Sequence, residues 1–177
     1  MKAIVRFFRQ RAVGGFMKHK KSCVLPDISK CLSVAVILDN EQFENHKEIE
    51  NTLKRLFEPK RYTFIVCVDE LPKDVVQTDR YFFIGKDDFN FWGLMKSGKK
   101  ESLLGLAFDL VMDFSKKSDG LLTNAYVLTL INNSFRMTFG SSCPAIYDMV
   151  IDSKNNDDIL NRIQISQQYL SMLLGKR

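Results

Sequence analysis

Short apolar runs alternate along this chain with longer segments in which apolar residues recur every three or four positions. The runs cover residues 31–38, 62–68, 80–84, 108–113, 136–139 and 147–151. Predominantly apolar runs of this length are typical of strands buried on both faces of a sheet. The alternation predicts an α/β fold: a three-layer, mostly parallel, Rossmann-like sheet of about five or six strands with helices on both faces.

One pattern, aromatic-Asp-apolar-Val-apolar-Asp, occurs twice, at 108–113 and at 147–152. Between the two copies we expect a helix over 121–135 and a short strand over 136–139. The connection between the last two strands is short, and a parallel crossover needs more chain. We therefore expect one of these two strands to be antiparallel or to lie at an edge of the sheet.

Two further segments have helical spacing of their apolar residues. The first covers 41–57 and follows Asp39-Asn40, a favourable N-cap sequence. The second is the C-terminal helix, which we expect to begin after Asn155 or Asn156.

The basic charge of the chain is concentrated at its N-terminus. Residues 1–30 contain eight Lys or Arg and one Asp, a local charge of +7, whereas the remaining residues contain 18 basic and 20 acidic side chains, or −2. We expect a short basic helix over 2–13, ended by Gly14-Gly15. The predicted organisation is a basic amphipathic arm or tether over 1–30 and a single α/β domain over 31–177.

This basic arm is a candidate for binding a partner or an anionic surface, either a membrane or a nucleic acid. Its candidate contact residues are Arg6, Arg9, Arg11, Lys18, Lys20 and Lys21. The alternative, which we favour, is a helix docked on its own domain and followed by a solvated tether, because one short helix binds lipid weakly by itself.

The composition favours a cytoplasmic protein with reduced thiols. None of the four cysteines forms a C-x-x-C pair, a spacing typical of metal and redox sites. No apolar run approaches the roughly 18 residues of a membrane-spanning helix. Arg6, Arg9 and Arg11 interrupt the apolar residues near the N-terminus, so we do not expect a cleaved signal peptide.

Ligands of open α/β sheets bind outside the carboxyl ends of the strands. The candidate residues at this rim are Asp39, Asn40, Asp69, Asp113, Gly140, Ser141 and Asp152. Several acids at one rim could hold a divalent cation for phosphoryl transfer. An acid that precedes a helix is also an ordinary N-cap, and we favour this second interpretation.

The signatures of several enzyme classes are absent. The turn after the first strand, Asp39 to Gln42, contains no glycine, so a dinucleotide pyrophosphate could not approach the backbone closely there. The chain contains neither a P-loop nor a G-x-S-x-G motif, and it has two histidines. The sequence therefore identifies no catalytic residue, no metal site and no cofactor.

A loop with bulky aromatic side chains follows the third strand. Its candidate residues are Phe89, Phe91 and Trp92. Such a loop either fills an edge of the core or is held ready for a ligand or partner, and we favour the first alternative.

Several motifs together resemble a family of small proteins from Bacteroidota known as a domain of unknown function. Besides the basic arm, they lie at 34–39, 89–93, 108–115, 135–140 and 147–153. The resemblance implies the α/β fold and carries over no catalytic residue. In addition, residues 108–140 resemble part of the N-terminal, Rossmann-like half of heptosyltransferase-type glycosyltransferases.

From these observations we predict a cytoplasmic, non-catalytic α/β domain that binds a protein or a small ligand. Two alternatives stay open. One is a small transferase or phosphoryl-handling enzyme that uses the acids at the carboxyl ends of the strands. The other is peripheral attachment to a membrane or a nucleic acid through the basic arm.

Overall fold

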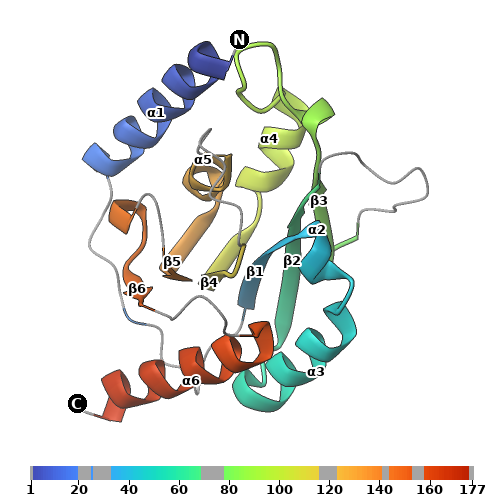
Figure 1. Ribbon diagram of the computed structural model, residues 1–177, viewed down its shortest axis with the longest axis vertical. Helices are drawn as coiled ribbons and strands as arrows, with labels where there is room; N and C mark the ends of the chain where they lie inside the picture. Colours follow the sequence, from blue (N-terminus) through green and yellow to red (C-terminus); the bar gives the residue numbers. More distant parts are fainter. Residues whose placement is uncertain are drawn as a thin grey trace.

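A computed structural model describes most of the chain and shows one parallel sheet (Figure 1). The described residues are 2–19, 25, 33–68, 78–115, 123–140, 144–152 and 158–175. The strands are β1 (Ser33–Asp39), β2 (Arg61–Cys67), β3 (Tyr81–Ile84), β4 (Ala107–Asp113), β5 (Asn132–Phe139) and β6 (Met149–Ile151). They lie in the order β3-β2-β1-β4-β5-β6, and every neighbouring pair is parallel. This confirms the predicted Rossmann-like α/β fold.

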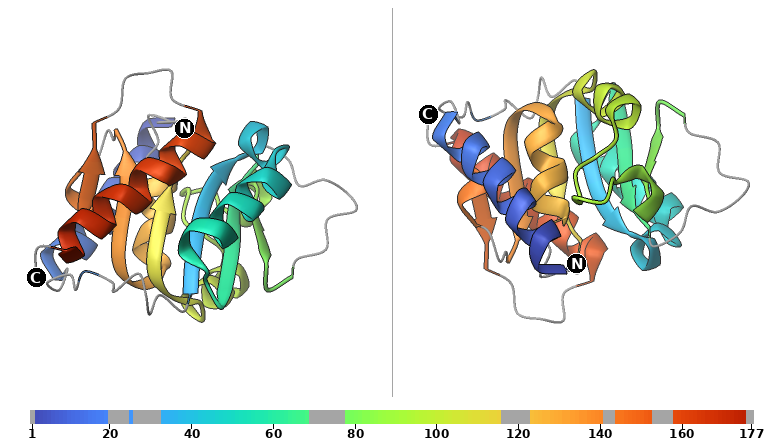
Figure 2. Two further views of the ribbon diagram at one scale, coloured as in Figure 1. Left: turned by 90° about the horizontal axis from the view of Figure 1, so that it is seen from below. Right: turned by 90° about the horizontal axis from the view of Figure 1, so that it is seen from above.

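Helices cover both faces of the sheet, as Figure 2 shows. The α-helices are α1 (Lys2–His19), α2 (Asn40–Phe43), α3 (His46–Phe57), α4 (Ser97–Leu104), α5 (Thr123–Leu130) and α6 (Ile159–Gly175), and the 3-10 helices are η2 (Lys86–Asp88) and η3 (Pro144–Ile146). Helices α3 and α6 pack together on one face, and α1 packs against α5 on the other. None of the helices in the described ranges is long and apolar enough to cross a membrane.

The central strand β1 shows why the sequence lacks an alternating polar pattern. Val34, Val36 and Leu38 face α3 and α6, whereas Ala35 and Ile37 face the α1 side, and all five are fully buried. A strand covered on both faces needs apolar residues at every position. The strand order reverses between β1 and β4, so the carboxyl ends of these two strands form the topological switch point of the sheet.

The predicted helix over 121–135 is too long. Helix α5 ends at Leu130, and β5 begins at Asn132, four residues earlier than the predicted strand. Asn132 and Asn133 pair with β4, opposite Ala107 and Phe108. Asparagine is a poor helix former, and pairing with the neighbouring strand overrides the helical spacing of the apolar residues after Leu130.

The last strand is parallel, so the antiparallel alternative is wrong, whereas the edge position is confirmed. Strand β6 has three residues and pairs with Met137 to Phe139, the carboxyl end of β5. The connection therefore returns along only a short part of the sheet, and nine residues that include η3 are enough.

Three other helices also differ from the sequence predictions. Helix α1 continues through Gly14-Gly15 to His19, because docking on the domain overrides the penalty of roughly 1 kcal/mol for each glycine. A turn at Glu44-Asn45 divides the predicted helix 41–57 into α2 and α3. Helix α6 begins at Ile159, directly after Asp158, while the predicted caps Asn155 and Asn156 lie outside the described residues.

Candidate functional site

Two of the predicted rim acids, Asp39 and Asp113, lie together at the switch point. Asp113 at the end of β4 pairs with Ile37 of β1, and Asp39 follows two positions later on the same strand. Because side chains alternate along a strand, Ile37 and Asp39 point to the same face of the sheet. Both aspartates are 3% exposed.

The carboxylate of Asp113 accepts several hydrogen bonds from its own chain. Its Oδ1 accepts the backbone N–H of Ser115 at 3.0 Å and the Ser115 hydroxyl at 2.6 Å, which closes a turn typical of aspartate. Its Oδ2 accepts the Tyr147 hydroxyl at 2.6 Å. Asn124 of α5 donates to the Ser115 hydroxyl at 2.5 Å. The carboxylate therefore connects β4 with α5 and with the segment before β6.

Burial raises the pKa of Asp113 above its ordinary value of 3.8. The hydrogen bonds from Ser115 and Tyr147 act in the opposite direction, and the nearby charge of Asp39 adds to the increase. A buried carboxyl of raised pKa beside a second acid is the pattern expected of a proton-transfer group, although buried structural networks produce it too.

Asp39 and Gln42 connect β1 with β4. Asp39 occupies the N-cap position of α2, in a capping box with Gln42. The Gln42 side chain accepts the backbone N–H of Asp39 at 3.0 Å and donates to the carbonyl oxygen of Phe114 at 2.7 Å. Gln42 was not among the residues predicted from the sequence, although an acid followed three residues later by glutamine is the signature of a capping box.

The other rim candidates that the structure describes are exposed, unlike this pair. Asn40, Gly140 and Asp152 are exposed, and Asp152 lies at the end of the edge strand β6. Asp69 and Ser141 lie outside the described residues. Among the residues that the structure describes, no three acidic, histidine or cysteine side chains form a group that could hold a metal ion.

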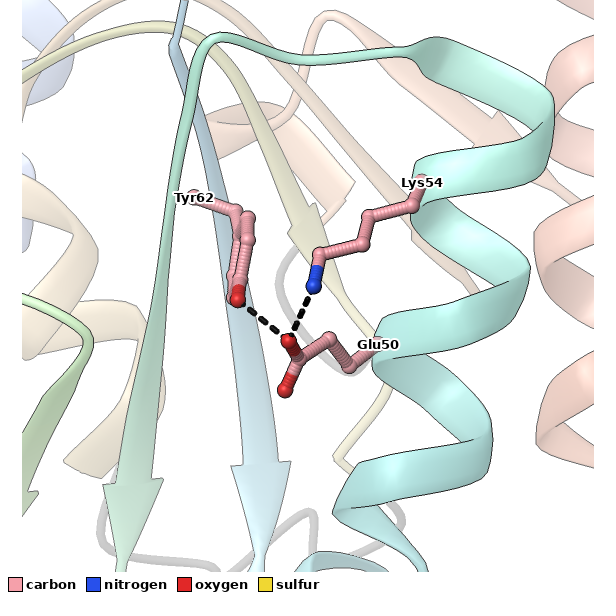
Figure 3. Close-up of polar contacts among 3 residues, drawn as sticks. All are labelled: Glu50, Lys54 and Tyr62. Atoms are coloured by element: carbon pink, nitrogen blue, oxygen red, sulfur yellow. Dashed lines mark hydrogen bonds and ion pairs between the residues drawn. The ribbon is translucent and has the colours of Figure 1, made fainter.

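A second polar cluster, which the sequence did not predict, lies at the amino end of β2 (Figure 3). Glu50 of α3 accepts the Lys54 ammonium and the Tyr62 hydroxyl, each at 2.5 Å. The hydrogen bond from Lys54, followed by that from Tyr62, lowers the pKa of Glu50. The cluster fastens α3 to β2 at the opposite end of the sheet from the switch point.

The basic arm is divided between a docked and an exposed part. Arg9 and Val13 are the buried residues of α1. The Arg9 guanidinium donates to the carbonyl oxygen of Gly93 at 2.8 Å and lies 4.7 Å from the centre of the Phe89 ring. Arg6, Arg11 and Lys18 are exposed, whereas the remaining arm candidates, Lys20 and Lys21, lie outside the described residues.

Four aromatic rings form a continuous cluster where α1 meets the loop before α4; we call Phe7, Phe8, Phe91 and Trp92 the aromatic surface. Phe8 lies 5.5 Å from Phe7 and 5.1 Å from Trp92, and Trp92 lies 5.3 Å from Phe91, between ring centres. Phe7, Phe91 and Trp92 are 57%, 61% and 47% exposed. The favoured expectation that the loop fills the core therefore holds for half-buried Phe89 and is wrong for Phe91 and Trp92.

One comparison with known proteins gives a match, and it covers almost the whole chain. The model of a family described as a family of unknown function, DUF6913, matches residues 6–173. The matched range includes both the switch-point acids and the four residues of the aromatic surface. No curated protein and no solved structure matches the chain significantly.

Proposed function

This chain belongs to DUF6913, a family of unknown function, and we propose that it acts as a non-catalytic interaction domain whose binding face is the aromatic surface. The observation that supports the proposal is the exposure of three large rings, Phe7, Phe91 and Trp92, in one contiguous cluster. Contiguous exposed apolar patches commonly mark interaction sites, and aromatic residues are enriched at the centres of interfaces.

The attachment of this surface to the fold supports the proposal further. Buried Arg9 holds the loop against α1 through the Gly93 carbonyl oxygen. The loop itself is a tight turn in which the Asn90 side chain accepts the backbone N–H groups of Trp92 and Leu94 at 3.0 and 3.1 Å. A rigidly presented patch loses little conformational entropy when a partner binds.

A second candidate function is catalysis at the switch point. The neighbouring acids Asp39 and Asp113 and the raised pKa of Asp113 favour it, because ligands of this fold class bind there. Against it, both acids are almost completely buried, and Asp113 already accepts hydrogen bonds from Ser115 and Tyr147.

A thermal-shift experiment separates the two functions. The full chain, Asp39→Ala and the rim control Asp152→Ala are heated with Mg²⁺ alone, with ATP alone and with both. An interaction domain predicts that no addition raises the Tm of the unmodified chain. A rise of several degrees that Asp39→Ala abolishes and Asp152→Ala retains would overturn the proposal in favour of the enzyme.

We further propose that the protein is cytoplasmic and comes from Bacteroidota. We also propose that residues 1–30 form an arm, that residues 31–177 form a single domain, and that residues 108–140 resemble part of the N-terminal half of heptosyltransferases.

A further inference from the structure

The charge around the aromatic surface indicates what it binds. The sequence of α1 contains Lys2, Arg6, Arg9, Arg11 and Lys18 and no acidic residue. Buried Arg9 donates to the carbonyl oxygen of Gly93, whereas the other four are exposed. The turn from Asn90 to Met95 contains no charged residue. The two elements that carry the exposed rings therefore contain four exposed cations and no anion.

The loop is built so that its rings remain beside α1. Gly93 has a φ of +75°, and a Cβ at this position would lie 2.3 Å from a methyl carbon of Val5. Glycine therefore allows the turn to approach α1 more closely than any other residue could. Figure 1 shows the amino end of α1 beside this loop. Phe91 and Trp92 are consequently presented together with Ile4 and Phe7, which are 42% and 57% exposed.

We propose that the exposed face of α1 together with the turn at 91–93 binds the surface of an anionic lipid bilayer. Aromatic and aliphatic side chains on one element, with Lys and Arg beside them, are the features of segments that lie at a membrane interface. The cations attract anionic headgroups, and the rings of Phe7, Phe91 and Trp92 enter the boundary between headgroups and acyl chains.

The ring geometry favours a bilayer over a single-stranded nucleic acid. Bases stack on open, parallel aromatic faces that line a basic groove. Here the three successive ring pairs of the aromatic surface pack against one another at interplanar angles of 83°, 59° and 82°. Rings that cover one another at steep angles suit insertion among acyl chains better than the stacking of bases.

This inference rests on the proposed function, and Trp92 provides its readout because it is the single tryptophan of the chain. The full chain is titrated with vesicles of phosphatidylcholine mixed with phosphatidylglycerol, and with vesicles of phosphatidylcholine alone. We expect a blue shift of Trp92 emission with the anionic vesicles, a weaker shift with the neutral ones, and release at high salt.

Two variants test the apolar and the cationic parts separately. Phe7→Ser/Phe91→Ser, at two exposed positions that leave the core intact, should weaken partitioning by about tenfold or more. Arg6→Gln/Arg11→Gln should weaken it to a similar extent, about tenfold, for anionic vesicles only. The matched control is Met172→Ser/Leu173→Ser on α6, where the side chains are 60% and 43% exposed, and it should bind as the unmodified chain does.

Several results would overturn the inference. One is an unchanged Trp92 emission with both kinds of vesicle, and another is equal loss of binding in the α6 control. A shift produced by a single-stranded oligonucleotide or by polyglutamate but not by vesicles would assign this face to a nucleic acid or to an acidic protein. A flat vesicle titration overturns this inference alone, because the proposed function is decided by the separate thermal-shift result.

Discussion

The switch point and the aromatic surface distribute polar and apolar groups in opposite ways. At the switch point, Asp39 and Asp113 are buried, although charged groups are costly to bury. At the aromatic surface, Phe91 and Trp92 are exposed, although burying them would stabilise the fold. Hydrogen bonds within the fold compensate the first departure, whereas Phe91 and Trp92 stay 61% and 47% exposed despite their ring contacts. The comparison therefore favours the aromatic surface as the functional region of the molecule.

The largest expected effect is the loss of stability when the hydrogen bonds to Asp113 at the switch point are removed. Asp113→Leu leaves the Ser115 N–H, the Ser115 hydroxyl and the Tyr147 hydroxyl without their acceptor, so the free energy of unfolding should fall by about 3 to 5 kcal/mol. Urea unfolding measures the change, and Asp152→Leu at the exposed end of β6 should stay within about 0.5 kcal/mol. Equal or greater stability of Asp113→Leu would indicate that Asp113 is retained for activity rather than for the fold.

A smaller loss of stability is expected when Gly93, which allows the aromatic surface to lie close to α1, is substituted. Gly93→Ala combines a positive φ with a methyl group 2.3 Å from Val5, so the free energy of unfolding should fall by about 2 to 4 kcal/mol. The spectrum of Trp92 should change with it, because the turn must move away from α1.

Gly98→Ala provides the matched control for this prediction. Gly98 lies in α4, and a Cβ there would meet nothing within 4 Å, so the substitution should be neutral or stabilise by about 0.5 kcal/mol. If both substitutions had the same effect, the turn would not depend on close contact with α1.

The smallest expected effect is on the pH dependence of stability, to which Asp113 and Glu50 contribute with opposite signs. The pKa of Asp113 is raised, so the folded state binds more protons and its stability should decrease as the pH rises from 3.8 through the raised value. The pKa of Glu50 is lowered, so its contribution is present above 4.5 and is lost as the pH falls through the lowered value.

Urea midpoints across the acidic range test both signs. Asp113→Asn should remove the decrease with rising pH, and Glu50→Gln should reduce the loss on acidification. The same slope for the unmodified chain and Asp113→Asn would show that Asp113 titrates alike in the folded and unfolded states.

The fold could be predicted from the sequence because each apolar run is interpretable locally. The run from Val34 to Leu38 has no polar residue, and only a strand covered on both faces suits it. The boundary between α5 and β5 could not be predicted, because pairing of Asn132 with β4 decides it.

The candidate sites were harder to predict from the sequence than the fold. The contact of Tyr147 with Asp113 joins residues 34 positions apart and depends on the placement of β6. Asp39 was identifiable as a cap because its signal lies within four residues. The exposure of Phe91 and Trp92 had no sequence signal, because the same aromatic residues would be expected in a loop that fills the core.

The most direct test of the central claim is the Trp92 emission shift with anionic vesicles, compared between Asp113→Asn and Phe7→Ser/Phe91→Ser. Asparagine can accept from Ser115 and donate to Tyr147, so Asp113→Asn should stay folded and bind vesicles as the unmodified chain does. The double phenylalanine variant should stay folded and lose the shift. Loss of the shift in folded Asp113→Asn, with retention in Phe7→Ser/Phe91→Ser, would contradict the account.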